Sequence, residues 1–136
     1  MANRRKDDVR AEKITLTKEH PEVTATTVMK VYKVPVGRAF HLTRALYHNI
    51  TGLAADATNA FAGTVQNAAT VAFTLFNTDS GDAGGALLTA DAFVEGVAGT
   101  AAARSFVAGD EITLVLTEDA AATLPAGTLI LEGLLY

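Results

Sequence analysis

The chain has 136 residues, enough for one domain that buries a core of its own and short for two. It has no Cys, which excludes disulfide bonds and thiolate metal sites and suits a cytosolic origin. No apolar run reaches the length of a membrane span, and residues 1–20 are too charged for a secretory signal, so we expect a soluble protein without a membrane partner.

The charges are unevenly distributed along the chain. Residues 1–33 hold eight Lys and Arg against five acids, whereas residues 34–136 hold three against ten. A nucleic-acid-binding domain is expected to interleave basic and aromatic residues across its folded part, and only Arg38, Arg44 and Arg104 are found there. The distribution predicts a basic arm, an acidic body and no nucleic-acid partner.

The N-terminal arm is expected to span residues 1–18. Residues 1–13 carry eight charges and few aliphatic side chains, which is typical of a segment without a core of its own. Such a segment becomes ordered by lying on another surface, and a short helix on its own domain is the alternative. The alternation of residues 14–18 favours a short first strand, which ends at His20 and Pro21.

From residue 19 to residue 136 the pattern predicts one β domain. Turn signals separate short alternating runs, and no amphipathic helix is evident. Residues 34–40, 106–112 and 124–130 each lead through a Gly into such a run. We interpret all three as tight corners, because Gly accepts a positive φ without steric cost.

Residues 53–68 are small and polar around Phe61 and are expected to form a long loop. Residues 128–136 are apolar on both faces, as in a strand that is covered on both sides, either within a sandwich or between subunits. The predicted strands of the domain are residues 23–34, 40–50, 70–77, 112–117 and 128–136.

These elements favour an all-β fold, an antiparallel β-sandwich or jelly roll that forms a single domain with an extended N-terminal arm. Its predicted core consists of the same-face members of the three cleanest alternating runs. They are Phe40, Leu42, Leu46, Val71, Phe73, Leu75, Ile112, Leu114 and Leu116.

The run 40–50 contains two polar exceptions. Strict alternation places Leu46 and Ile50 on the face of Phe40 and Leu42, with His41, Thr43 and Tyr47 on the other face. Arg44 and His48 then fall on the apolar face. They form either a buried polar pair or a place where that face meets a partner, and the cost of burying an unpaired charge favours the partner.

No constellation of residues points to catalysis or to a bound metal. His41 and His48 lie seven residues apart on one predicted strand and so face opposite sides, while His20 stands in a turn. Residues 79–82 resemble a fragment of a calcium loop but lack the spaced acids that follow in that motif. The chain has two Ser, neither in a nucleophile-elbow sequence, and no phosphate-binding loop. We therefore expect no enzyme activity, no cofactor and no metal.

Several segments carry a family likeness. They are the corner VPVGR at 34–38, the strand end NITG at 49–52, and the late runs FVAGDEITL at 106–114 and LPAGTLIL at 124–131, set around an Ala-, Thr- and Gly-rich middle. With the charged arm, this arrangement resembles the small head decoration, or cement, proteins of tailed bacteriophages.

The resemblance implies a virion protein that is made in the bacterial host cytoplasm and binds the major capsid protein on the outer capsid surface, where it stabilises the shell. It implies a homo-oligomer, with a trimer as the expected state, and no catalytic residues. We expect the arm to clamp a neighbouring subunit, with Ile14 and Leu16 adding a strand to an exposed sheet edge. The residues expected to contact a partner are Arg4, Arg5, Lys6, Arg10, Lys13, Ile14, Leu16, Arg44, His48, Leu134, Leu135 and Tyr136.

Two other functions remain open from the sequence. A phage tail or baseplate component would share the same features. A carbohydrate-binding β-sandwich would need exposed aromatic platforms, and the chain has no Trp and only Tyr32, Tyr47 and Tyr136.

Overall fold

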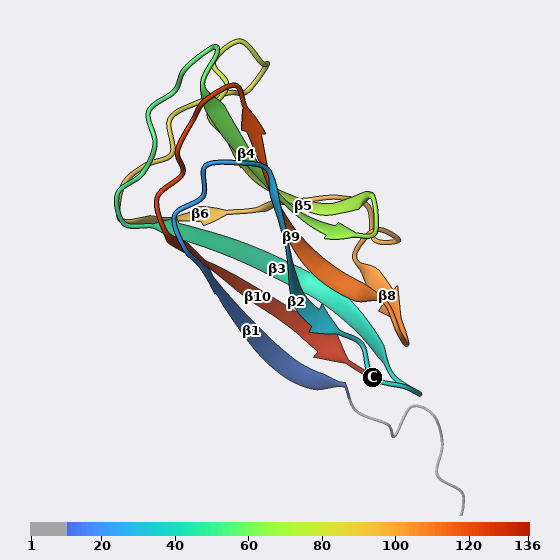
Figure 1. The fold of residues 1–136 in the computed structure, drawn as a ribbon. Helices are drawn as coiled ribbons and strands as arrows, with labels where there is room; N and C mark the ends of the chain where they lie inside the picture. Colours follow the sequence, from blue (N-terminus) through green and yellow to red (C-terminus); the bar gives the residue numbers. More distant parts are fainter. Residues whose placement is uncertain (1–10) are drawn as a thin grey trace, which may run out of the picture.

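The computed structural model describes residues 11–136, which form two antiparallel sheets packed face to face (Figure 1). One sheet has the order β1-β10-β3-β6, with β8 also paired to β3, and the other has the order β2-β9-β4-β5-β7. The predicted antiparallel β-sandwich is thus confirmed. The strands are β1 Glu12–His20, β2 Thr27–Lys33, β3 Ala39–Asn49, β4 Ala60–Asn67, β5 Thr70–Asn77, β6 Ala92–Glu95, β7 Val97–Ala98, β8 Ser105–Val107, β9 Glu111–Asp119 and β10 Gly127–Leu135.

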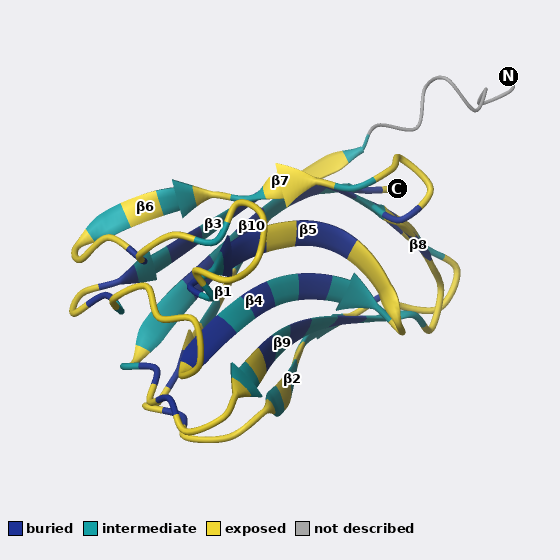
Figure 2. Ribbon diagram, turned by 90° about the horizontal axis from the view of Figure 1, so that it is seen from above, coloured by how far each residue is buried: buried dark blue, intermediate teal, exposed yellow. Residues whose placement is uncertain are grey.

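The core lies between the sheets, and buried positions alternate with more exposed ones along β4, β9 and β10 (Figure 2). Seven of the nine predicted core residues are buried. Leu46 and Val71 are the two exceptions, since Leu46 is half-buried and Val71 is 38% exposed. Both errors have the same cause, a β-bulge that shifts the alternation by one residue.

The bulge in β3 is at Thr43. Arg44 pairs with Glu132 of β10 and Leu42 pairs with Gly133, so Thr43 is left without a partner. Beyond it the alternation is reversed. The buried residues on the far side are Ala45, Tyr47 and Asn49, while Arg44, Leu46, His48 and Ile50 turn away from the core.

β5 contains two such irregularities against β4. Gln66 pairs with Val71 and Val65 with Phe73, which leaves Ala72 unpaired, and a second register shift leaves Leu75 unpaired. The result is that β5 buries two adjacent pairs of residues, Ala72 with Phe73 and Leu75 with Phe76. Val71 falls outside the core as a consequence.

The expectation of a long loop over residues 53–68 was wrong for its second half. Residues 60–67 form β4, which lies inside the second sheet between β9 and β5. Gly63 is one reason why the sequence pattern did not indicate a strand here. A Cβ atom there would lie 2.5 Å from the Phe76 ring, so the missing side chain makes room for an aromatic neighbour.

Two of the three predicted corners have Gly at a positive φ, Gly37 at 77° and Gly109 at 88°. The third prediction was wrong, because Gly127 is the first residue of β10 and has no positive φ. Its missing side chain makes room for neighbours, since a Cβ atom there would press on Tyr47 and His20.

The expected boundary between an arm of residues 1–18 and a domain of residues 19–136 does not match the strands. β1 begins at Glu12 and pairs along its whole length with β10, so residues 12–18 belong to the sandwich. Within residues 11–136 there is no helix long and apolar enough to cross a membrane.

Candidate functional site

The residues predicted to bind a partner separate into three groups in the structure. Arg4, Arg5, Lys6 and Arg10 lie outside the described residues. A second group points into the sandwich, and a third lies on the surface of the first sheet. Tyr136 follows β10 at the end of the sandwich and is 51% exposed.

Ile14, Leu16 and Leu135 form the inward group. Ile14 and Leu16 are partly buried against the core, and Leu135 is 6% exposed. In the isolated chain β1 adds its strand to β10 of the same sandwich, and the expectation that Ile14 and Leu16 also contact a neighbouring subunit stays a prediction. Leu135 is likewise a core residue.

The outward group is brought together by strand register. Lys13 pairs with Leu134, and Leu134 pairs with His41, so β1, β10 and β3 present one continuous row. Further rows contain Arg44 and His48. We call the surface that this sheet turns away from the core the outer face. Its members are Lys13, Thr15, Thr17, Glu19, His41, Arg44, Leu46, His48, Phe93, Glu95, Thr128, Ile130, Glu132 and Leu134.

Arg44 lies on the outer face and forms ion pairs with two acidic residues on neighbouring strands. Its Nε and Nη2 atoms each lie 2.9 Å from one carboxylate oxygen of Glu95, and its Nη1 lies 3.8 Å from Glu132. The hydrogen bonds from Arg44 lower the pKa of the Glu95 carboxyl. Arg44 thus crosses the face from β10 to β6. It is not a member of a buried polar pair.

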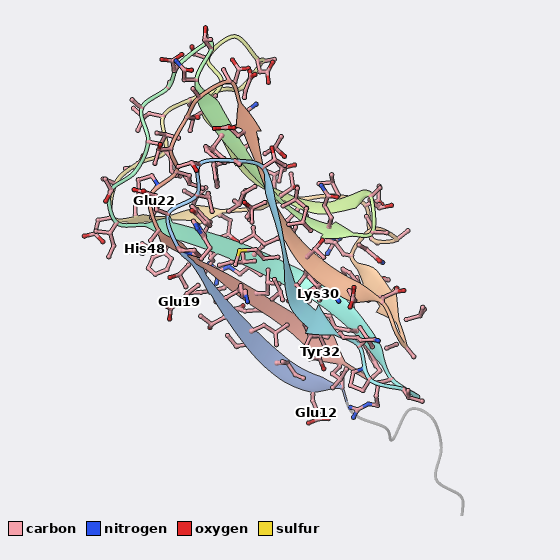
Figure 3. All side chains as sticks on the ribbon, viewed as in Figure 1. Glu12, Glu19, Glu22, Lys30, Tyr32 and His48 are labelled. Carbon is pink, nitrogen blue, oxygen red and sulfur yellow. The ribbon has the colours of Figure 1, made fainter. Side chains whose placement is uncertain are left out.

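His48 marks one end of the outer face, in register with Glu19 of β1 through Thr128 (Figure 3). Its Nε2 lies 3.0 Å from an Asp91 carboxylate oxygen, and its ring packs on Phe93 with 4.9 Å between centroids. Phe93 is 62% exposed. Sequence reasoning missed Phe93 as a surface residue, since the short apolar pair Phe93 and Val94 does not show which of its two side chains faces the core.

The outer face is more apolar than the free face of a sandwich sheet usually is. Leu46, Ile130 and Leu134 are half-buried on it, and Phe93 is largely exposed. The corresponding face of the second sheet combines short polar side chains with Val28, Val71 and Val97, which are exposed but smaller than the Leu, Ile and Phe side chains of the outer face. Among its members are Thr64, Gln66, Thr74, Thr113 and Thr117, with Lys30 on β2.

A buried polar network lies below the outer face, and the sequence did not predict it. His20, Tyr47 and Asn49 are at most 3% exposed. His20 Nε2 lies 2.6 Å from the Tyr47 hydroxyl, and Asn49 donates to that hydroxyl and to the carbonyl oxygen of Pro125. Burial lowers the pKa of His20 and raises that of Tyr47 to about 12. The network joins β1 to β3.

One nucleophile lies beside a base. His41 Nδ1 is 3.0 Å from Ser105 Oγ, and the single proton of that hydroxyl is donated to the carbonyl oxygen of Ala101 at 2.9 Å. Catalytic Ser–His pairs need a third group that orients the His, and no hydrogen bond to the other ring nitrogen of His41 occurs among the described residues. The pair therefore reads as a surface contact between β3 and β8.

Within residues 11–136 no group of three or more His, Asp or Glu side chains is placed to hold a metal ion. A hollow of about 450 Å³ on the outer face lies beside the β3 bulge between Lys13, Thr43 and Leu134.

Comparison with known proteins gave no match to a protein family, to a curated protein or to a solved structure. The sandwich and its outer face are therefore the basis for a functional proposal.

Proposed function

We propose that this chain is a structural protein of a tailed-bacteriophage particle, a capsid decoration protein that binds the major capsid protein on the outer shell surface. It acts by binding and has no catalytic role. The proposal takes its protein class from the sequence resemblance. The observation that carries it is the outer face, which presents the large apolar side chains Leu46, Phe93, Ile130 and Leu134 around the Arg44 ion pairs.

The composition of the outer face fits a binding surface. Half-buried aliphatic side chains supply area that loses water on contact, and each fully buried side chain of this size contributes about 1.5–3 kcal/mol. The Arg44, Glu95 and Glu132 cluster lies among them and supplies charge for orientation. Repetition of one modest contact over many copies on a shell gives strong total attachment.

The first experiment is localisation. Particles purified from infected cells are dissociated in mild steps, and the fraction that releases the chain is identified by mass spectrometry. The proposal predicts release with shell proteins while the tails stay intact. Co-purification with isolated tails would favour the tail or baseplate alternative instead.

The second experiment assigns the surface. Leu46→Glu and Ile130→Glu place a charge on the outer face, and we expect both to abolish co-sedimentation with undecorated shells. Val115→Glu, at a half-buried outward position of β9 on the opposite sheet, is the matched control. Equal binding by all three variants would exclude the outer face as the contact surface.

A further inference from the structure

β1 is an edge strand with an open side. It pairs only with β10, and no backbone hydrogen bond joins it to another described segment (Figure 1). Every second residue of β1 therefore presents an amide N–H and a carbonyl oxygen to the side away from β10. Such a row is a template for another strand.

The edges of the two sheets differ in how they are protected. β2, the edge of the second sheet, carries a register shift near Val31 as well as Lys30 and Lys33. The edges formed by β6, β7 and β8 are at most four residues long. β1 runs for nine residues in regular register with neither bulge nor Pro. Among the described strands it is the long edge without a bulge, although like β2 it carries charged side chains.

The side chains of β1 alternate in a way that suits a second copy of the same strand. Glu12, Ile14, Leu16 and Lys18 share the inward side, because their partners on β10 face the core. Reading along this side, the order is acid, apolar, apolar, base. An antiparallel copy of that order is complementary to the original.

We propose that β1 pairs antiparallel with β1 of a second copy of this chain, about a two-fold axis at Thr15, so that the first sheet continues across a dimer. In this register Glu12 stands opposite Lys18 of the other copy, and Ile14 stands opposite Leu16. Each pair occurs twice by symmetry. Opposite charges and apolar pairs directly across an antiparallel ladder are stabilising, and like charges are destabilising.

Neighbouring registers fit less well. A shift by one residue sets Lys13 against Lys18 and Glu12 against Glu19, and it also turns each inward side chain against an outward one. A shift by two residues centres the axis on Leu16. It pairs Lys13 with Glu19 on the outer face, but on the inward side it sets Ile14 against Lys18 and Glu12 against His20. The inward side chains therefore favour the register about Thr15, which sets Glu12 against Lys18 and Ile14 against Leu16.

The proposed dimer is independent of the proposed function. A single two-fold interface gives a dimer, which differs from the trimer implied by the sequence resemblance. The mass of the native protein in solution distinguishes the two, since one chain is 14.2 kDa. A mass of two chains is expected at high concentration. A monomer at every concentration, or a trimer, would overturn the proposal.

Single-cysteine variants test the register, and the native chain has no Cys to interfere. Thr15→Cys places the two thiols directly opposite each other, with Cβ atoms about 4.5–5.5 Å apart, close enough for a disulfide after small adjustment. Thr17→Cys, on the same face, is the matched control, since its two copies lie about 13 Å apart along the ladder. We expect mild oxidation to cross-link only the Thr15 variant. Cross-linking of both variants, or of neither, would contradict the pairing.

Charge reversal provides a second test by sedimentation equilibrium. Lys18→Glu and Glu12→Lys each set two like-charge pairs across the interface and are expected to weaken dimerisation about tenfold or more. Glu12 also forms an ion pair with Arg38 of its own chain at 2.8 Å, which Glu12→Lys removes. The double variant E12K/K18E restores opposite charges across the interface and should recover part of the affinity. Lys13→Glu, which faces Thr17 in this register, is the matched control. Weakening by Lys13→Glu but not by Lys18→Glu would overturn the assigned register, and circular dichroism checks that each variant is folded.

Discussion

His20 and Tyr47 meet across β10, although 27 residues separate them in the chain. The imidazole Nε2 lies 2.6 Å from the phenol oxygen, and the two rings are nearly parallel with centroids 5.7 Å apart. Gly127 lies between their strands, and its lack of a side chain lets them approach. The first and third strands are thus joined directly through the strand between them.

The hydrogen bonds of this pair define the neutral tautomer of His20. Its Nδ1 lies 2.7 Å from the carbonyl oxygen of Pro21, which only accepts, so Nδ1 carries the proton. Nε2 must then accept from the Tyr47 hydroxyl, and that hydroxyl accepts from Asn49. A proton on Nε2 would remove the acceptor that the hydroxyl uses. Burial and geometry therefore both disfavour the charged imidazole.

Stability is expected to fall in mild acid because of His20. Its folded-state pKa lies below the unfolded value of 6.5, so the unfolded chain binds more protons between those two values. The free energy of unfolding should therefore decrease as pH falls below about 6.5, by at most about 1.4 kcal/mol per pH unit from this group. Urea unfolding over this range measures it, with His20→Gln as the variant whose profile should be flatter. An unchanged slope in that variant would assign the acid effect to other groups.

Tyr47 should produce a separate loss of stability in alkali. The unfolded chain ionises this phenol near pH 10, whereas burial raises its folded-state pKa to about 12. Between those values the folded state holds the extra proton, so stability declines as pH rises. Spectrophotometric titration should show one late-ionising Tyr in the native protein. Tyr47→Phe removes that late step, and its persistence in the variant would mean that another Tyr is responsible.

Gly127→Ala is expected to destabilise the fold by about 1–3 kcal/mol, the usual cost of overpacking. The new Cβ atom would press on the Tyr47 hydroxyl, on His20 Nε2 and on the carbonyl oxygen of His48. The neighbouring change Thr128→Ala, on the outer face, serves as the control and should have little effect. Thermal unfolding of both variants is the measurement, and equal melting temperatures would show that Gly127 is not required for close packing.

Gly133→Ala tests the packing opposite the β3 bulge. A Cβ atom at Gly133 would overlap the Phe40 ring, so we again expect a loss of about 1–3 kcal/mol. Phe40→Leu replaces the aromatic ring with a smaller side chain and so makes room for the new methyl group. The double variant should therefore lose less stability than the sum of the two single losses. Additive effects in this double-mutant cycle would indicate that the two residues do not interact.

Alternation was enough to predict the strands whose side chains follow it without interruption. Ile112, Leu114 and Leu116 on β9 were assigned correctly to the core for this reason. The same rule failed at Leu46, because the extra residue at Thr43 leaves no mark in the sequence. A bulge is a property of the paired strands, and a single-strand pattern does not contain it.

For the candidate site too, the sequence predicted individual residues but not the strand pairing that brings them together. Lys13, Arg44, His48 and Leu134 do share one surface, but the register that unites them depends on β10 lying between β1 and β3. Sequence reasoning placed Tyr47 on the face opposite to the core. The bulge in β3 reverses the alternation, so Tyr47 is in fact buried in the core. The His20–Tyr47 contact was therefore out of reach, since it needs both the bulge and the space at Gly127.

The antiparallel pairing of β1 with β10 also sets how the sandwich responds to mechanical load. Glu12 lies opposite Leu135, so tension applied between these two residues pulls across the ladder at one end. The ladder would then open like a zipper, breaking one pair at a time at low force. Tension applied between Glu12 and Gly127 instead runs along the strands and loads many hydrogen bonds together. The β1–β10 ladder therefore resists force well along its strands and poorly through the end where β1 begins.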